Sequence, residues 1–116
     1  MGSQSNRSER VAQQIQAELS RLIEYKVKDP RLDTITVTAV KVTRDFSHAK
    51  VYFVTRDKEK REQSLMVLQK ASGFLRHNLA NELLLRTVPE LHFHYDTSSE
   101  YGQHIDNLLN KLDLKD

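Results

Sequence analysis

The sequence predicts a single α+β domain in which helices pack on a small three-stranded sheet. Its 116 residues suit one modest core. Apolar residues recur at helical spacing near both ends and in the middle of the chain, and three short segments between them alternate as strands do. The composition is 38% hydrophobic and 29% charged, and no stretch approaches the roughly 20 apolar residues of a membrane span. We therefore expect a soluble globular protein.

The first predicted element is an amphipathic helix. Residues 1–6 are small and polar and are expected to form a loose tail. Ser8 is the expected N-cap of the helix that follows, whose apolar stripe is Val11, Ala12, Ile15, Leu19, Leu22 and Ile23. The helix is expected to end within residues 25–28, because Pro30 disfavours helical backbone at the residue before it.

A β-hairpin is predicted next. Residues 34–43 are rich in β-branched side chains, and their alternation slips between Val37 and Val40, which indicates a strand with a bulge. Residues 49–54 alternate as a second strand. The polar residues 44–48 between them predict a turn, so the two strands should pair antiparallel.

A long helical region follows, with Asp57 as its expected N-cap. Its apolar face consists of Leu65, Leu68, Ala71, Leu75, Leu79 and Leu83. Unbroken, this would be a helix of about 27 residues, near the upper limit for a globular protein. Glycine inside a helix costs about 1 kcal/mol relative to alanine. We therefore expect a kink at Gly73.

The last predicted elements are a third strand and a short helix. Pro89 ends the helical region, and in residues 91–95 apolar side chains alternate with two histidines. Thr97 and Glu100 have capping-box spacing ahead of a final apolar stripe, Ile105, Leu108, Leu109 and Leu112. The predicted element order is therefore α-β-β-α-kink-α-β-α, with the last helix packed back on the domain.

Charge and cysteine content narrow the functional classes. The net charge is +2, but residues 41–86 carry ten basic and five acidic side chains, whereas residues 87–116 carry two and six. This gradient suits a protein that offers one face to a polyanion, although chance variation on a solvated surface explains it equally well. The absence of cysteine removes disulfides, thiolate metal ligands and a cysteine nucleophile, and it fits a reducing cytosol.

Six short motifs support a more specific interpretation. They are Arg10-Val11-Ala12; Lys28-Asp29-Pro30-Arg31-Leu32; Asp45 followed by Ala49-Lys50-Val51-Tyr52; Ala71-Ser72-Gly73-Phe74-Leu75-Arg76; Val88-Pro89-Glu90-Leu91; and Asp96-Thr97-Ser98 ahead of Gly102 and Ile105. In this order and spacing they resemble the ribosome-binding factor A family over residues 7–112. The element order likewise is that of a type II KH-like domain, at residues 7–96, with a C-terminal helix appended at 97–116.

The resemblance implies a cytoplasmic, monomeric assembly factor without enzymatic activity, cofactor or membrane contact. Such a factor binds the free small (30S) ribosomal subunit or its precursor, through 16S rRNA and ribosomal proteins. It assists rRNA folding and 5′-end maturation and matters most in the cold. The resemblance also implies that Ala71-Ser72-Gly73 is an interhelical Ala-x-Gly kink that replaces the usual Gly-x-x-Gly loop of KH domains.

The kink is the main expected RNA-binding site. A glycine at a helix junction lets a ligand approach the backbone, and the N–H groups of the following helix favour phosphate. Ala71, Ser72 and Gly73 fit this role, and Lys70 and Arg76 are placed to flank the same spot. In the alternative interpretation, Gly73 only allows close helix packing.

Three further cations complete the expected RNA-binding set. Lys28 and Arg31 bracket the Asp29-Pro30 turn, and Arg10 belongs to the first motif. Equally, Asp29 caps backbone amides while the two cations beside it are only solvated. The mixed charges of residues 57–62 are more typical of an exposed helix start than of a binding site.

The strand aromatics have two possible roles. Side chains that alternate along a strand are more often core than stacking platforms for bases, so we expect Phe53 and Phe93 in the core. For Tyr52 the sequence leaves both roles open, core residue or stacking platform.

Two rival functions fit parts of the sequence. A metalloenzyme would use His92 and His94 with His104 or Asp96. Histidine pairs on solvated strands are common without metal, and no catalytic motif surrounds them, so we expect no metal site and no catalysis. A protein-binding adaptor would instead use the acidic C-terminal region without touching RNA. Its binding would depend little on salt, whereas phosphate contacts impose a steep salt dependence.

Overall fold

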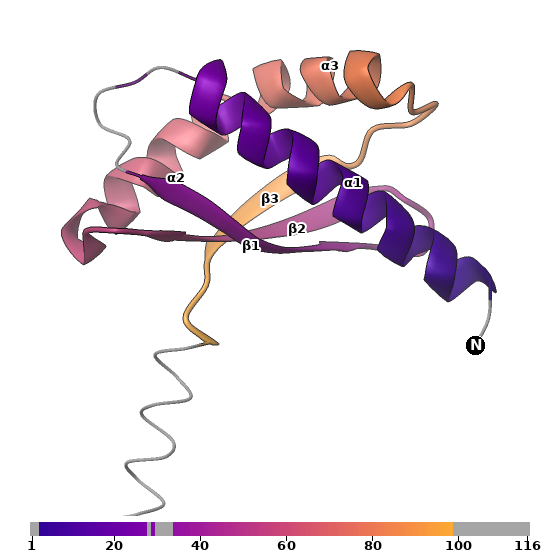
Figure 1. Ribbon diagram of the computed structural model, residues 1–116, viewed down its shortest axis with the longest axis horizontal. Coiled ribbons are helices and arrows are strands. Elements are labelled where there is room, and N and C mark those ends of the chain that lie inside the picture. The colour runs from indigo at the N-terminus through magenta and orange to yellow at the C-terminus, as the bar shows by residue number, and fades with distance from the viewer. Residues whose placement is uncertain (1–2, 28, 30–33, 99–116) are drawn as a thin grey trace, which may run out of the picture.

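The computed structural model describes residues 3–27, 29 and 34–98, with side chains from residue 7 onward. The elements are α1 (Ser3–Tyr25), β1 (Ile35–Val42), β2 (His48–Thr55), the single 3-10 turn η1 (Lys58–Lys60), α2 (Arg61–Lys70), α3 (Ser72–Leu83) and β3 (Glu90–Tyr95). This order confirms the α+β prediction (Figure 1). The expected C-terminal helix at 97–116 lies outside the described residues apart from its first two positions.

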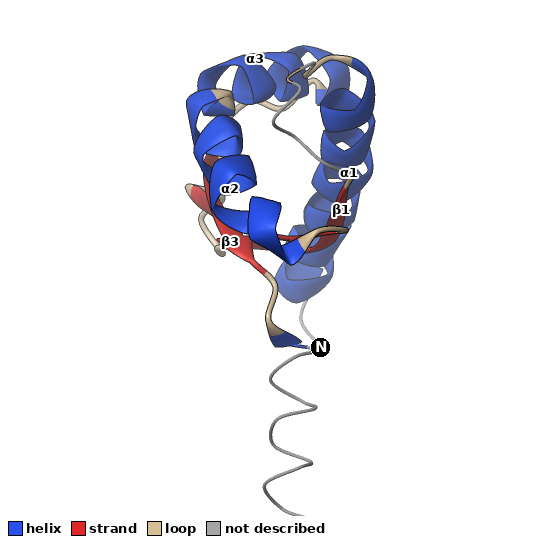
Figure 2. Cartoon of the chain, turned by 90° about the vertical axis from the view of Figure 1, so that its left-hand side faces the viewer, coloured by secondary structure: helices blue, strands red, loops and turns tan. Residues whose placement is uncertain are grey.

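The sheet has the order β1-β2-β3, with β2 in the centre. β1 and β2 form the expected antiparallel hairpin, and the register shifts between Val37 and Ala39, which confirms the bulge. β3 pairs with β2 in parallel, from His48 opposite Glu90 to Phe53 opposite Tyr95. Parallel neighbours need a crossover connection, and α2 and α3 provide it. Among the residues that the structure describes, α1, α2 and α3 lie against one face of the sheet, and none of the described elements covers the other face (Figures 1 and 2).

The core lies between the helices and the covered face of the sheet. Phe53 and Phe93 are buried there, as expected from their alternation. The predicted stripe of α1 is confirmed, with Val11 half-buried and the other five residues buried. In the crossover helices, the buried apolar residues are Val67, Leu68, Leu75 and Leu79. No helix of the described part is both long and apolar enough to cross a membrane.

α1 ends at Tyr25, within the predicted range, but it begins at Ser3. The prediction of a helix start capped by Ser8 is therefore wrong, and residues 3–6 of the expected loose tail are helical. Residues 3–7 contain neither glycine nor proline, so nothing in them stops a helix that the apolar stripe has already stabilised.

The break between α2 and α3 falls at Ala71, two residues before the predicted kink at Gly73. Ala71 has φ −84° and ψ 0°, angles that any residue tolerates, so the chain turns here without glycine. The Ala71 N–H still donates to the Val67 carbonyl at 2.9 Å, and the Ala71 carbonyl accepts from the Leu75 N–H at 2.9 Å. The two helices are therefore joined directly, and Gly73 lies in the first turn of α3.

Two short polar segments, one before β2 and one after it, are each held by hydrogen bonds to an aspartate side chain. In the hairpin turn, Asp45 Oδ1 accepts hydrogen bonds from the Ser47 hydroxyl at 2.7 Å, the Ser47 N–H at 3.1 Å and the Thr43 hydroxyl at 2.8 Å. These bonds, led by the Ser47 hydroxyl, lower the pKa of Asp45 from 3.8 to about 2. After β2, Asp57 accepts from the Glu59 N–H at 3.0 Å and so caps the 3-10 turn η1, one turn ahead of the helix for which it was predicted, and α2 itself begins without a side-chain cap.

Candidate nucleic-acid interface

The start of α3 is the centre of the candidate interface. Ala71 stands at its N-cap position and has no side-chain acceptor, and α3 begins without a side-chain cap. The first N–H groups of a helix have no partners within the helix, and they give this end a partial positive charge. The start of α3 can therefore hydrogen-bond to an anionic ligand such as a phosphate.

Gly73 lies exposed in the first turn of α3. A Cβ added to it would meet nothing within 4 Å, and its φ is not in the left-handed region. Neither packing against the described residues nor the backbone conformation requires a glycine at this position. The alternative interpretation, in which Gly73 allows close helix packing, is therefore wrong. The space left by the missing side chain opens on the solvent side.

Lys70 and Arg76 differ in their surroundings, although both are three residues from Gly73. Lys70 is exposed at the last position of α2. Arg76 is half-buried, and its guanidinium donates from Nε to the Pro89 carbonyl at 3.1 Å and from Nη2 to the Val88 carbonyl at 2.9 Å. Arg76 thus holds the segment that leads into β3 against α3, and Lys70 is the cation that the break offers to solvent.

Two residues of this surface were not singled out from the sequence. Phe74 is 47% exposed directly beside Gly73, an uncommon position for a large aromatic ring. His77 is exposed one turn later, within 3.3 Å of the Asn81 amide. The apolar stripe of this helix could have identified Phe74 as exposed, because a helix that buries Leu75 and Leu79 turns Phe74 away from the core.

The structure does not bring all predicted RNA-binding residues together. Ala71 and Ser72 are half-buried at the break, next to Lys70 and Gly73. Arg10 is exposed in the N-terminal half of α1, which lies at the opposite end of the molecule from α2 (Figure 1). Lys28 and Arg31 lie outside the described residues. The assembled part of the predicted site is therefore residues 70–73, and Phe74, which was not predicted, lies directly beside it.

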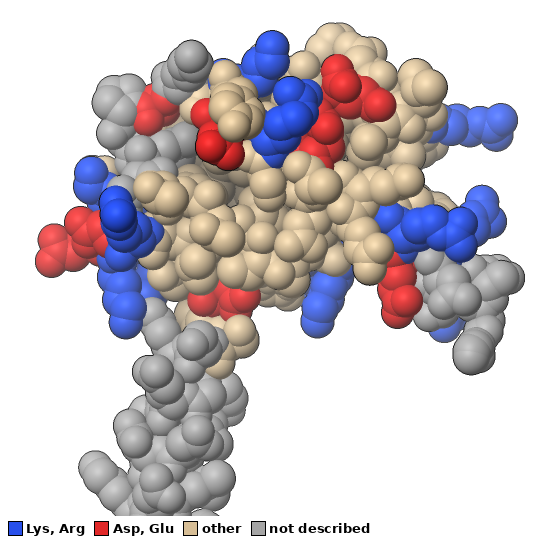
Figure 3. All heavy atoms as spheres, viewed as in Figure 1, with Lys and Arg blue, Asp and Glu red and all other residues tan. Residues whose placement is uncertain are grey.

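The remaining cations do not form one continuous patch on the face seen in Figure 3. Lys and Arg side chains stand there in separate groups around uncharged surface. Within the mixed-charge segment 57–62, Arg61 is half-buried and its guanidinium lies 4.0 Å from the centre of the Tyr95 ring. This contact packs the start of α2 on β3, which agrees with a structural role for this segment.

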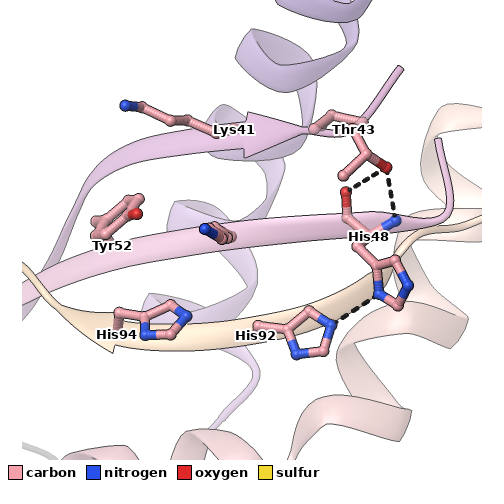
Figure 4. Close-up of a pocket in the computed structure, with 8 residues that line it drawn as sticks. Lys41, Thr43, His48, Tyr52, His92 and His94 are labelled. Atoms are coloured by element: carbon pink, nitrogen blue, oxygen red, sulfur yellow. Dashed lines mark hydrogen bonds between the residues drawn. The ribbon is translucent and has the colours of Figure 1, made fainter. Parts of the chain in front are cut away.

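The open face of the sheet carries a second group of polar side chains. They surround a shallow hollow of about 590 Å³, and its lining includes Lys41, Lys50, Tyr52, His48, His92 and His94 (Figure 4). Tyr52, whose role the sequence left open, is half-buried here with its ring centre 5.7 Å from that of His94. The antiparallel pairing of β1 with β2 brings Lys41 beside Lys50, and the parallel pairing of β2 with β3 adds the side chains of β3.

His92 and His94 share this face, as their spacing predicted. The other ligands considered for them are placed differently. His104 is outside the described residues, and Asp96 accepts hydrogen bonds from the Thr38 hydroxyl and the Ser98 N–H, which lower the pKa of Asp96. Instead, His92 Nε2 lies 2.9 Å from Nδ1 of His48.

Three features define this α+β protein as a member of the type II KH-like class. They are the parallel β2–β3 pair, the helices on one face of the sheet, and the direct junction of α2 and α3 in place of the usual Gly-x-x-Gly loop. The sequence model that describes ribosome-binding factor A matches residues 7–109. The chain belongs to the ribosome-binding factor A family.

Relatives and solved structures agree with this assignment. The ribosome-binding factor A of Pseudomonas fluorescens is 44% identical over the whole of this chain and 90% of its own length. The crystal structure of the Thermus thermophilus factor superimposes with a TM-score of 0.69 at 31% identity, covering 76% of this chain and 94% of that one. A homology model of the Thermus thermophilus factor, fitted into a cryo-electron-microscopy map of a 30S complex with that factor, gives a TM-score of 0.65 at 32% identity, covering 74% of this chain and 91% of that one.

Proposed function

We propose that this protein is a cytoplasmic, monomeric assembly factor that binds the free 30S subunit or its precursor, without catalysing a reaction. It assists 16S rRNA folding and 5′-end maturation, most of all in the cold. Membership of the ribosome-binding factor A family supports this proposal. So does the structural similarity to a factor that is placed in a 30S complex.

The proposed RNA contact is the segment 70–74. The observation that carries it is Gly73, an exposed helical glycine that neither packing nor backbone angles require. Around it lie the uncapped start of α3, the cation of Lys70 and the exposed ring of Phe74. Together these groups can bind a phosphate, release counterions and stack on an unpaired base.

The proposed mechanism is differential binding. A factor that binds one rRNA arrangement more tightly than its competitors shifts the population toward that arrangement, and no covalent step is needed. Because the contacts are to phosphate and to the faces of bases, they recognise the shape of folded rRNA more than its base edges.

The first test is co-sedimentation with separated 30S subunits, 50S subunits and whole ribosomes over a series of salt concentrations. We expect selective pelleting with 30S subunits that weakens steeply as salt rises. Absence of pelleting at low salt contradicts the proposal. Binding to 30S subunits that is insensitive to salt favours an adaptor that contacts ribosomal proteins.

A matched pair of charge reversals tests the contact surface. Lys70→Glu changes the proposed surface, and Lys41→Glu makes the same change on the open face of the sheet. Both side chains are exposed, so both variants should fold. We expect Lys70→Glu to weaken 30S binding and reduce its salt dependence, and Lys41→Glu to do neither. The opposite result would move the contact to the sheet.

A further inference from the structure

Three possible metal ligands converge where β2 and β3 begin. His48 and Glu90 are directly paired across the two parallel strands, and His92 follows two residues later on the same face. Leu91 and Phe93, which alternate with them along β3, are buried in the core. The backbone at this point is fixed by a hydrogen bond of 2.9 Å from the Glu90 N–H to the Ser47 carbonyl. The three polar side chains therefore project from a well-held strand start.

The ligand atoms are close enough to bind one ion. His48 Nδ1 lies 2.9 Å from His92 Nε2 and 3.8 Å from Glu90 Oε1, and the three ligand atoms lie within 4.8 Å of one another. Metal–nitrogen bonds of about 2.0–2.1 Å place two ligands of one ion about 3–3.4 Å apart at octahedral or tetrahedral angles. Figure 4 shows the two imidazoles already facing each other. Only small side-chain rotations separate this arrangement from a bound state.

A single proton can join only two of these three groups directly. Each nitrogen of a neutral imidazole carries either a proton or a lone pair, so one proton joins His48 to His92. The Glu90 carboxylate, at 3.8 Å, is beyond hydrogen-bond distance of the same His48 nitrogen. A divalent cation in place of that proton would satisfy all three acceptors at once.

We propose that His48, Glu90 and His92 form a binding site for a first-row transition-metal ion, with Zn²⁺ as the reference ion. Two imidazoles and one carboxylate suit zinc and its neighbours, whereas calcium and magnesium prefer oxygen ligands. The bound ion would tie the start of β3 to the start of β2 and leave a coordination position for water. This inference does not depend on the proposed function.

The surroundings limit the affinity of the site. Lys50 pairs with His92 in the register, and Lys41 lines the same hollow. Both cations are exposed on this face, and their positive charges repel a metal cation bound nearby. We therefore expect weaker binding than at a buried structural zinc site.

Calorimetric titration of Zn²⁺ into the untagged full chain, freed of metal by a chelator, tests the proposal. His92→Gln and Glu90→Gln each remove a ligand, and His94→Gln is the matched control on the same strand and face. We expect the unchanged protein and His94→Gln each to bind one zinc ion per chain. Binding should be at least about tenfold weaker in the two ligand variants, because even outer-shell changes cost about that much.

A second readout separates loss of a ligand from loss of the fold. Zn²⁺ should raise the thermal midpoint of the unchanged protein and of His94→Gln, but not that of His92→Gln, while the metal-free midpoints stay similar. The proposal is overturned if the unchanged protein does not bind zinc, if His92→Gln binds as well as the unchanged protein, or if His94→Gln loses as much affinity as His92→Gln.

Discussion

Replacing Gly73 by alanine should stabilise the protein and weaken its function. A glycine inside a helix destabilises it by about 0.5–1 kcal/mol relative to alanine, because glycine loses more conformational freedom on folding. Beyond its own helical turn, the new Cβ meets no atom of the described residues within 4 Å, so no clash offsets this gain. For a domain of this size, about 1 kcal/mol corresponds to about 4–8 °C in the thermal midpoint. We expect the midpoint of Gly73→Ala to rise by a few degrees.

The same methyl group should interfere with RNA. It projects into the space through which a phosphate would reach the start of α3, so it should prevent close approach. A loss of about tenfold in 30S affinity corresponds to about 1.4 kcal/mol. Thermal unfolding and co-sedimentation at one salt concentration would measure the two effects on the same preparation.

Asn81→Ala is the matched control. Asn81 is exposed on α3 away from the break, so its replacement also improves helix propensity and leaves residues 70–74 untouched; it removes only the contact of the Asn81 amide with His77. The reasoning is refuted if Gly73→Ala binds 30S subunits as well as the unchanged protein. It is refuted equally if Gly73→Ala lowers the thermal midpoint, because the space around Gly73 would then not be open.

Three further predictions concern stability. Arg76→Ala should lower the free energy of unfolding in urea by about 1.5–3 kcal/mol, since it removes two hydrogen bonds from a charged donor; a change under about 0.5 kcal/mol would contradict this role. Asp45→Asn should lower the thermal midpoint at neutral pH. The lowered pKa of Asp45 means that its carboxylate stabilises the turn above pH 3.8 and loses this effect as the pH falls through about 2. The thermal midpoints of Asp45→Asn and the unchanged protein should therefore converge near pH 2, and a difference that stays constant with pH would argue against this role. Ser64→Ala should raise the free energy of unfolding by about 1 kcal/mol, because the buried Ser64 hydroxyl has no hydrogen-bond partner among the described residues; destabilisation would indicate an unseen partner.

Local patterns predicted most of the described fold. The stripe of α1, the alternation of the strands and the slip after Val37 each depend on neighbours along the chain, and all are confirmed. The helix break falls within the Ala71-Ser72-Gly73 kink that the resemblance implied, but at Ala71 and not at Gly73, because Ala71 turns with ordinary backbone angles and no residue type marks it. The early start of α1 was missed because polar residues permit a helix without requiring one.

The candidate sites were less predictable, because they depend on contacts between distant segments. The sequence identified the segment around Gly73, but it could not show that Arg76 donates to carbonyls just before β3. Likewise, His48 and His92 meet only because β3 pairs with β2 in one particular parallel register. A shift of that register by one residue would turn His92 to the other face of the sheet.

The central position of β2 also has a consequence for folding during synthesis. The hairpin is complete once Thr55 has left the ribosome, but the other edge of β2 stays unpaired until residues 90–95 emerge. An unpaired strand edge is a template for pairing with other chains. Nascent chains that stop within the crossover helices should therefore aggregate, and the full protein should depend on prompt arrival of its last strand.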